Sequence, residues 1–376
     1  MNRFIPLLLA PIFVACGMYN QNLEKPSSIS LEQIELPAGF KIETFADSIV
    51  NARSLAIGDQ GTIFVGSRSA GNVYAVVDTN RDRKADLTYT LAEGLNTPNG
   101  VAFRNGDLYV AEIDKIWKYP NIESQLASPP TPELITDNLP SDAWHGWKNI
   151  QFGPDDKLYV PVGAPCNICE EEDERYATIL RMNPDGSEQE VYAKGVRNSV
   201  GMDWHPETQA LWFTDNGRDM LGDDLPPDEL NHAPEQGMHF GFPYCHAGSI
   251  PDPQYGEKAP CSDFTAPAQN LHPHGAALGM IFYQGDMFPE AYRNQILICE
   301  HGSWNRSELI GYQVSIVKLS GDRAVSFEPF AAGWLKDGKA NGRPVDIVML
   351  DDGSLLVSDD HADAIYRISY ADPTDS

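Results

Sequence analysis

The sequence predicts an all-β chain folded as a six-bladed β-propeller. A strand–turn–strand–loop–strand pattern recurs six times, with Gly, Asp or Asn at the turns. No window of useful length shows helical periodicity. The units follow one another at roughly the forty-residue spacing of propeller blades, or wider. A β-sandwich would not explain six similar units, whereas radial repetition leaves few open sheet edges.

The six units can be followed in order along the chain. Their strands fall within 56–74, 101–117, 150–181, 202–213, 280–298 and 347–367. A further strand at 40–45 is predicted to complete the last unit and so close the ring. Long insertions at 164–178, 217–275 and 301–311 follow corresponding strands. Insertions at equivalent blade positions fall on one face, so this face is predicted to bind the ligand.

The N-terminus is predicted to be a targeting segment. Arg3 precedes an apolar run that is too short to span a bilayer. Cys16 follows a small residue, as in a bacterial lipobox, which predicts a lipidated Cys16 and a membrane tether on the periplasmic face. Phe13 departs from the usual Leu, so simple secretion remains the alternative. The predicted organisation is a signal peptide over 1–16, a flexible tether over 17–34 and a catalytic propeller over 35–376.

The charge of the chain excludes two classes of partner. It has 54 Asp and Glu against 27 Lys and Arg, which gives a formal charge of -27. Such a surface repels nucleic acid and anionic lipid, and both are excluded as binding partners.

Five cysteines remain after Cys16, and disulfides persist in exported proteins. The C-x-x-C at 166–169 is not a haem attachment site, because Glu170 stands where a His is needed. A zinc site that also used Cys245 and His246 is an alternative, which an oxidising compartment disfavours. The predicted state is two bridges, Cys166–Cys169 and Cys245–Cys261, with Cys299 as a buried free thiol.

The most informative segment is 296–306, where an apolar strand breaks into a polar cluster. The cluster holds His301, Trp304, Asn305 and Arg306, a mixture that structure alone does not require. This segment is similar to the EHGSWNR segment of the sorbosone and pyranose dehydrogenase family, relatives of the soluble glucose dehydrogenases that use pyrroloquinoline quinone (PQQ). The resemblance extends over residues 36–370. It implies a propeller that oxidises a sugar with PQQ and Ca²⁺ and passes electrons to a periplasmic acceptor.

His145 is the predicted general base. It lies where a loop leads into a strand on the insertion face, and the alternative is a His that only packs at the blade edge. The stretch from His145 to Gly163 is similar to the soluble glucose dehydrogenases, which implies that His145 takes the sugar hydroxyl proton. Ala164 stands where those enzymes place an orienting Asp, so another group must orient His145. His301 is the rival base.

Arginines at corresponding loop positions predict an anionic ligand. The turn at 195–201 resembles the family's G-x-R-N-x-x-G, which implies that Arg197 and Asn198 meet PQQ. Arg suits a tricarboxylate because its charge is permanent and its fork binds carboxylates bidentately. Each Arg could instead pair with a surface acid. The full predicted cofactor set is Arg68, Arg197, Asn198, His301, Trp304, Asn305, Arg306 and Arg343.

The loop at 215–243 resembles the family's calcium-binding loop. The resemblance implies that the carbonyls of Gly217 and Arg218 reach the cofactor's Ca²⁺, and that Asp228 and Glu229 hold a second, structural ion. Arg218 replaces the family's Pro and the loop carries an insertion at 220–227, and a solvated acidic loop is the alternative. A His-x-His pair at 272–274 could bind a transition metal, but loop residues near the substrate mouth are favoured.

The predicted function is therefore PQQ- and calcium-dependent oxidation of an aldose or related sugar, with hydride transfer to PQQ and a His base. A calcium-dependent lactonase or other hydrolase is one alternative, and it would need acidic ligands that converge on the channel. A non-catalytic binding propeller is the other, and Ala164 is its only hint. Fold alone does not choose among them, and the arginines favour the dehydrogenase.

Overall fold

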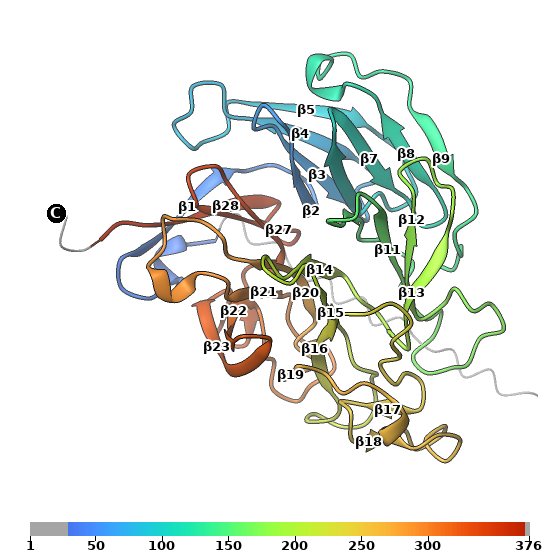
Figure 1. The fold of residues 1–376 in the computed structure, drawn as a ribbon. Helices are drawn as coiled ribbons and strands as arrows, with labels where there is room; N and C mark the ends of the chain where they lie inside the picture. Colours follow the sequence, from blue (N-terminus) through green and yellow to red (C-terminus); the bar gives the residue numbers. More distant parts are fainter. Residues whose placement is uncertain (1–28, 373–376) are drawn as a thin grey trace, which may run out of the picture.

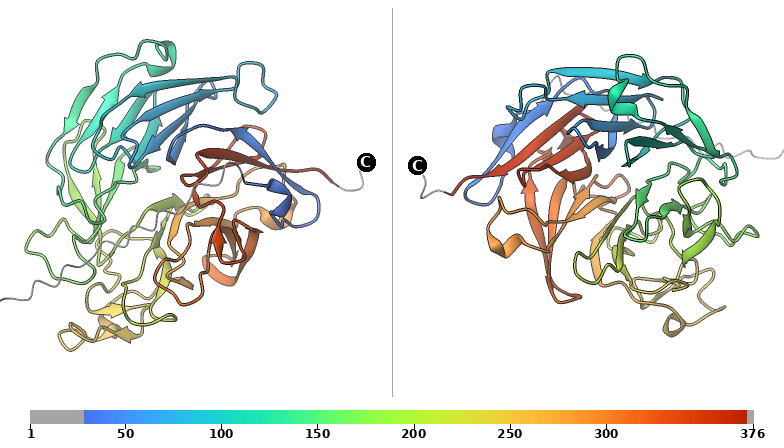
Figure 2. Two further views of the ribbon diagram at one scale, coloured as in Figure 1. Left: turned by 180° about the vertical axis from the view of Figure 1, so that it is seen from behind. Right: turned by 45° about the horizontal axis from the view of Figure 1, so that its top comes forward.

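The computed structural model describes residues 29–372, and within them six four-stranded antiparallel sheets follow one another around a central axis (Figures 1 and 2). Blade 1 contains β2 (Ala52–Ile57), β3 (Ile63–Ser67), β4 (Val73–Val77) and β5 (Leu87–Ala92). Blade 2 contains β6 (Gly100–Arg104), β7 (Asp107–Ala111), β8 (Ile116–Tyr119) and β9 (Glu133–Thr136). Blade 3 contains β10 (Gln151–Phe152), β11 (Leu158–Val162), β12 (Thr178–Met182) and β13 (Glu190–Lys194).

The other three blades complete the predicted six-bladed propeller. Blade 4 contains β14 (Gly201–Trp204), β15 (Leu211–Asp215), β16 (Pro227–Ala233) and β19 (Gln269–Pro273). Blade 5 contains β20 (Ala277–Phe282), β21 (Ile296–Glu300), β22 (Gln313–Ser320) and β23 (Arg323–Ala332). Blade 6 contains β26 (Pro344–Met349), β27 (Leu355–Asp359), β28 (Ala364–Tyr370) and β1 (Phe40–Ala46).

The ring closes as the sequence predicts. The early strand β1 pairs antiparallel with β28, from Phe40 opposite Tyr370 to Ala46 opposite Ile365. The two strands come from opposite ends of the chain and lie side by side in Figure 1. This pairing joins the first and last parts of the propeller into one blade and so closes the ring.

The described chain holds little besides these blades. Two short hairpins are formed by β17 (Cys245–His246) with β18 (Ile250–Pro251) and by β24 (Leu335–Lys336) with β25 (Lys339–Ala340). Short 3-10 turns lie at Leu31–Gln33, Ile122–Ser124, Cys261–Asp263 and Glu290–Tyr292. None of the helices between residues 29 and 372 is long and apolar enough to cross a membrane.

The hydrophobic core lies between blades rather than inside one layer. One cluster of buried side chains lies at each of the six blade interfaces, and Phe64 of blade 1 stacks on Phe103 of blade 2 at 5.5 Å. Blade faces are therefore covered on both sides, which explains why β3 reads Ile-Phe-Val without polar alternation. Each such side chain contributes about 1.5–3 kcal/mol by leaving water.

The predictions about the cysteines and the N-terminal segment differ in how far the structure tests them. Both predicted disulfides, Cys166–Cys169 and Cys245–Cys261, are present, and Cys299 is a buried free thiol. Cys245 is therefore not available for zinc, and the neighbouring His246 bonds to Asp252 instead. The predicted signal peptide and Cys16 lie outside the described residues. Ile34, at the end of the predicted tether, is buried in the cluster between blades 5 and 6, so the packed domain extends upstream of residue 35.

Candidate functional site

A cavity of about 290 Å³, the central cavity, opens on the insertion face. Most of its walls come from loops that precede the first strand of a blade or follow the second, and these loops lie at the same end of an antiparallel sheet. Arg53, Asp228 and Leu278 reach it from within strands β2, β16 and β20. The lining residues are Arg53, Arg68, His145, Trp147, Arg197, Asn198, Asn216, Gly217, Asp219, Asp228, His274, Ala276, Leu278, His301, Gly302, Trp304, Asn305 and Arg343. Distant parts of the sequence thus meet at one cavity, as the insertion pattern predicts.

The charge of the central cavity is opposite to that of the chain. Arg53, Arg68, Arg197 and Arg343 line it, and the only carboxylates among its lining residues are Asp219 and Asp228. The guanidinium of Arg68 lies 4.7 Å from the ring centre of Trp147 and has no hydrogen-bond partner among residues 29–372. Arg68 is exposed to solvent, yet the protein atoms around its guanidinium, followed by the positive charge of Arg53, lower its pKa to about 10. The cavity is therefore electrostatically prepared for an anion.

Arg53 and Arg343 are held by the walls of the cavity. Arg53 is 2% exposed, and it donates to Asn99 at 2.8 Å and to Asp360 at 2.9 Å. Arg343 donates to the carbonyls of His301 and Gly302 at 2.9 and 2.8 Å. These contacts fix the direction of each guanidinium, and Arg343 keeps one nitrogen without a protein partner among the described residues.

Arg197 is held more completely than the other three. It donates to the carbonyls of Asn216 and Gly217 at 3.0 and 2.9 Å, and to the backbone and side-chain oxygens of Asn167 at 2.9 Å each. Asn167 lies inside the Cys166–Cys169 loop, and its side-chain oxygen also accepts the backbone N–H of Asp219 at 2.8 Å. The disulfide loop thus positions Arg197, a role that the sequence analysis missed.

His145 lies at the edge of the cavity with a defined tautomer. Its Nδ1 is 2.8 Å from the carbonyl of Ala164, which can only accept, so Nδ1 carries the proton and Nε2 is an acceptor. The missing carboxylate at position 164 is therefore replaced by the backbone carbonyl of the same residue. Gly163 permits this approach, because a Cβ there would lie 2.6 Å from the Cβ of His145. Burial and then Arg197 lower the pKa of His145 to about 3.

His301 belongs to a second buried polar chain. Its Nε2 donates to Asp360 at 2.7 Å, and the other carboxylate oxygen of Asp360 accepts from Arg53. Burial and then Arg343 lower the pKa of His301 to about 3, although Asp360 acts in the opposite direction. Against the effect of burial, His301 and Arg53 hold the pKa of Asp360 far below its ordinary value. Asp360 and Arg53 were not selected from the sequence, because no local pattern marks them.

Asp228 and Glu229, which were predicted to hold the structural calcium together, do not face the same space. Asp228 and Glu229 are neighbours on β16, so their side chains leave opposite faces of the strand. Asp228 faces the central cavity, where both its oxygens accept backbone N–H groups from Gly217 and Ala276 at 2.8 Å. The side chain of Arg218 points away and donates to Asp252 at 2.6 Å. No group of three or more His, Cys, Asp or Glu between residues 29 and 372 is placed to hold a metal.

Glu229 instead meets Asp215 at a second, much smaller cavity. This cavity measures about 10 Å³, roughly the space of one water molecule or ion. Burial, followed by the charge of Glu229, raises the pKa of Asp215 well above its ordinary value, and burial raises the pKa of Glu229 to about 6. Two buried carboxylates at one small space have the charge of a cation site, but their oxygens also accept N–H groups from Arg197, Asn198, Ala247 and Asn231.

Two further sequence predictions have other surroundings. Arg306 does not line the central cavity, because it donates to the Asp223 carbonyl and, at 3.2 Å, to Asp224. It therefore holds the insertion loop after β15. His272 bonds to Glu300 at 2.8 Å, whereas His274 lines the cavity and bonds to the carbonyls of Gly222 and Leu225. The two histidines diverge and do not form a metal pair.

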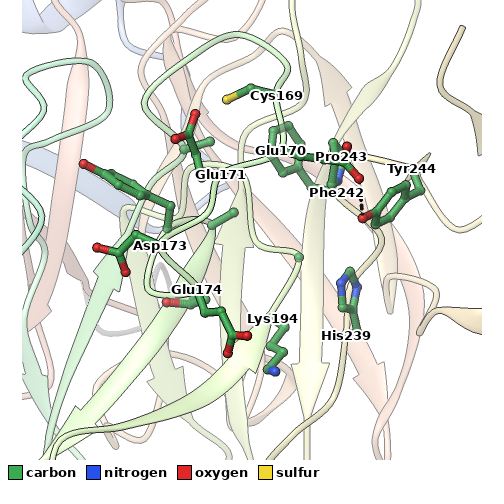
Figure 3. Close-up of a pocket in the computed structure, with 15 residues that line it drawn as sticks. Cys169, Glu170, Glu171, Asp173, Glu174, Lys194, His239, Phe242, Pro243 and Tyr244 are labelled. Carbon is green, nitrogen blue, oxygen red and sulfur yellow. Dashed lines mark hydrogen bonds between the residues drawn. The ribbon is translucent and has the colours of Figure 1, made fainter. Parts of the chain in front are cut away.

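A second large cavity, about 310 Å³, lies between the 164–178 insertion and the loop at 239–244. Figure 3 shows Glu170, Glu171, Asp173 and Glu174 around it, with Lys194 at one side. Its four carboxylates would repel an anionic cofactor. The central cavity, with four arginines, is therefore the better candidate for the cofactor site that the sequence predicts.

Comparison with known proteins agrees with the propeller fold. The family model described as TrAA12-like matches residues 34–371. An uncharacterized protein of Borreliella burgdorferi is 35% identical over 361 residues, which cover 90% of this chain and 91% of that protein. The iodide structure of a family AA12 carbohydrate-active enzyme from Trichoderma reesei superposes with a TM-score of 0.77 at 18% identity, over 90% of this chain and 98% of that one. The holo form of the PQQ domain of pyranose dehydrogenase from Coprinopsis cinerea superposes with a TM-score of 0.75 at 17% identity, over 93% and 99%.

Proposed function

The chain belongs to the TrAA12-like family, and from this premise we propose that it oxidises an aldose or related sugar with PQQ as its cofactor. One observation carries the proposal. Four arginines line the central cavity of a protein whose net charge is -27, and one of them, Arg68, has a guanidinium without a hydrogen-bond partner among residues 29–372. Such a site suits a small polyanion, and PQQ is a flat tricarboxylate.

The residues present fit that cofactor. Arg68 and Arg343 both retain donors that can reach a carboxylate, and Trp147 and Trp304 supply flat apolar walls. The cavity of about 290 Å³ is near the lower end of the usual size for a ligand site. A lactonase would instead need acids that converge on the channel, and among the described residues only two carboxylates, Asp219 and Asp228, line the central cavity against four arginines.

His145 is assigned the part of general base. Its Nδ1–H is fixed on Ala164, so Nε2 stays an unprotonated acceptor at neutral pH and can take the proton of a sugar hydroxyl. The positive charge of Arg197 beside it disfavours the imidazolium and favours the alkoxide that proton removal leaves. Bound PQQ would supply the acceptor for the hydride that leaves the sugar carbon.

The two predicted calcium positions differ in how well they fit. The Gly217 carbonyl accepts from the Arg197 guanidinium at 2.9 Å, so a cation is already beside it and a calcium ion does not fit there in this conformation. The Asp215–Glu229 cavity does fit an ion, and we assign the structural calcium to this pair in place of Asp228 with Glu229. An ion there would neutralise two coupled carboxylates and stabilise the loops around β15 and β16.

The cellular location is part of the proposal. Two disulfides are typical of an exported protein, which supports a periplasmic or secreted chain. Lipidation at Cys16 would tether it to the membrane, and metabolic labelling of the wild type and Cys16→Ala with a fatty-acid analogue tests this. Label in both proteins, or in neither, would contradict the lipid anchor.

Reconstitution of the apoprotein tests the activity. PQQ with Ca²⁺ should give a saturable absorbance change and reduction of a dye with an aldose. His145→Ala should still bind PQQ but lose about 10²–10⁴ in turnover, the usual contribution of general acid–base catalysis. His301→Ala is the rival variant. If His145→Ala turns over normally while His301→Ala is inactive, the base is His301, and the absence of PQQ binding would overturn the dehydrogenase proposal itself.

A further inference from the structure

The lone pair of the proposed base is already occupied by a neighbouring side chain. The indole Nε1–H of Trp144 donates to Nε2 of His145 at 3.0 Å, and the two rings stand perpendicular with centres 6.0 Å apart. Because Nδ1–H is committed to Ala164, Nε2 has a single lone pair and no second acceptor site. A sugar hydroxyl and the indole therefore compete for the same lone pair.

The indole is held weakly. Trp144 is 55% exposed, and an indole has only one donor, so the bond to His145 is its one conventional hydrogen bond. A single neutral hydrogen bond contributes about 0.5–1.5 kcal/mol net, which a substrate that brings its own donor can replace. The backbone also favours this contact, because His145 has a φ of 51° and brings its ring beside that of the preceding residue.

We propose that Trp144 is a positioning residue that caps the base in the resting protein and is displaced by the substrate hydroxyl. The inference rests on the proposed function, since it takes His145 as the base. The exchange breaks one N–H···N bond and forms one O–H···N bond, with no covalent change. The place now occupied by the indole nitrogen thus marks where the reacting sugar oxygen binds. The bond also holds the neutral imidazole with Nε2 directed toward the incoming hydroxyl.

Trp144→Phe tests the cap, because it keeps an aromatic ring and removes only the donor. In apoprotein labelled with ¹⁵N-histidine at pH 7.5, the Nε2 resonance of His145 should move downfield when the lone pair loses its donor. Trp304→Phe is the matched control: Trp304 is 64% exposed and has no hydrogen bond to His145. It lines the central cavity with His145, whereas Trp144 is not a lining residue of that cavity. This control should leave the Nε2 resonance in place.

The reconstituted enzyme gives a second, independent measurement. Trp144→Phe should lower KM for the sugar about 2- to 10-fold with kcat little changed, because the competing donor is gone. An unchanged Nε2 resonance in Trp144→Phe would overturn the proposal, and so would a raised KM, which would make Trp144 part of the sugar-binding surface. Failure of the dehydrogenase proposal would look different, since turnover would be absent in every variant while the resonance still moved.

Discussion

Replacement of His145 by Gln should reduce the amount by which the free energy of unfolding falls in acid. The imidazole is 8% exposed, no carboxylate bonds to it, and burial with Arg197 lowers its pKa to about 3, against 6.5 in the unfolded chain. Below pH 6.5 the unfolded state therefore takes up a proton that the folded state does not. Stability from this group is fully present above pH 6.5 and falls as the pH drops toward 3.

The size of the effect follows from the pH interval. Each pH unit between the two pKa values is equivalent to about 1.4 kcal/mol, so two units, from pH 6.5 to pH 4.5, remove about 2.7 kcal/mol. Gln does not titrate and can still donate to the Ala164 carbonyl. His145→Gln should therefore lose about 2.7 kcal/mol less than the wild type on acidification.

Urea unfolding at pH 7.5 and pH 4.5 measures this difference. The carboxylates are the same in both proteins, so their titration cancels when the two acid losses are subtracted. His272→Gln is a control of opposite sign. The bond to Glu300 raises the pKa of His272, so its stabilisation is present below its unfolded pKa and is lost as the pH rises. That variant should lose more stability in acid than the wild type.

An equal acid loss in the wild type and His145→Gln would refute the reasoning. It would mean that the folded protein protonates His145 as readily as the unfolded chain does. The proposed base would then be largely imidazolium below pH 6.5. If the reasoning holds, the acid limb of kcat/KM lies well below pH 6.5, because the neutral imidazole persists there.

Three further predictions concern the arginine cavity. Arg68→Ala and Arg343→Ala should each weaken PQQ affinity about 10- to 100-fold in absorbance titrations, since a charge-assisted contact contributes about 1.5–3 kcal/mol. Arg306 lies outside the cavity, so Arg306→Ala should leave the affinity unchanged. Equal losses in all three variants would argue against the central cavity as the PQQ site. Asp360→Asn should lower the free energy of unfolding by about 3–5 kcal/mol, because it leaves Arg53 buried and unpaired. Asp351→Asn removes one partner of an exposed ion pair and should change the free energy of unfolding by less than about 1 kcal/mol. Similar effects of the two substitutions would contradict a buried ion pair between Arg53 and Asp360. Asn167→Ala should weaken PQQ binding through Arg197, while Asn183→Ala in an exposed turn should not, and unchanged titrations for Asn167→Ala would remove its positioning role.

The fold could be predicted from the sequence because its signals are local and repeated. Each blade repeats an apolar strand, a turn and a second strand, and its closing partner at 40–45 is recognisable as an unpaired strand. The residues that the sequence analysis missed are of another kind. Arg53 is the second residue of a strand and Asp360 follows the end of another. The sequence around neither residue indicates that the two side chains meet between blades 1 and 6. Such long-range pairs are fixed by tertiary placement, which spacing along one segment does not reveal.

Strand geometry separates the two side chains that were predicted to share a structural calcium. A resemblance to a motif transfers residue types, but alternation along β16 sends Asp228 and Glu229 to opposite sides. The same alternation brings Glu229 to Asp215, because these residues are paired across β15 and β16. The structural calcium that we propose would therefore use Asp215 with Glu229 in place of Asp228.

The four arginines would allow a chain so rich in acids to bind the anionic cofactor that we propose. A guanidinium that is partly withdrawn from water and surrounded by like charges is destabilising unless an anion offsets it. Asp360 offsets Arg53, and Asp219 together with carbonyls of the disulfide loop and the β15 loop offsets Arg197. Arg68 lies beside Arg53 and Arg343, is opposed in charge by Asp360, and has only an aromatic face in direct contact with its guanidinium. The protein therefore holds one unmet positive charge at the mouth of the cavity, inside a negative surface that repels other polyanions. Under the proposed function, the same distribution of charge would favour a small, flat polyanion in the cavity and disfavour nucleic acid at the surface.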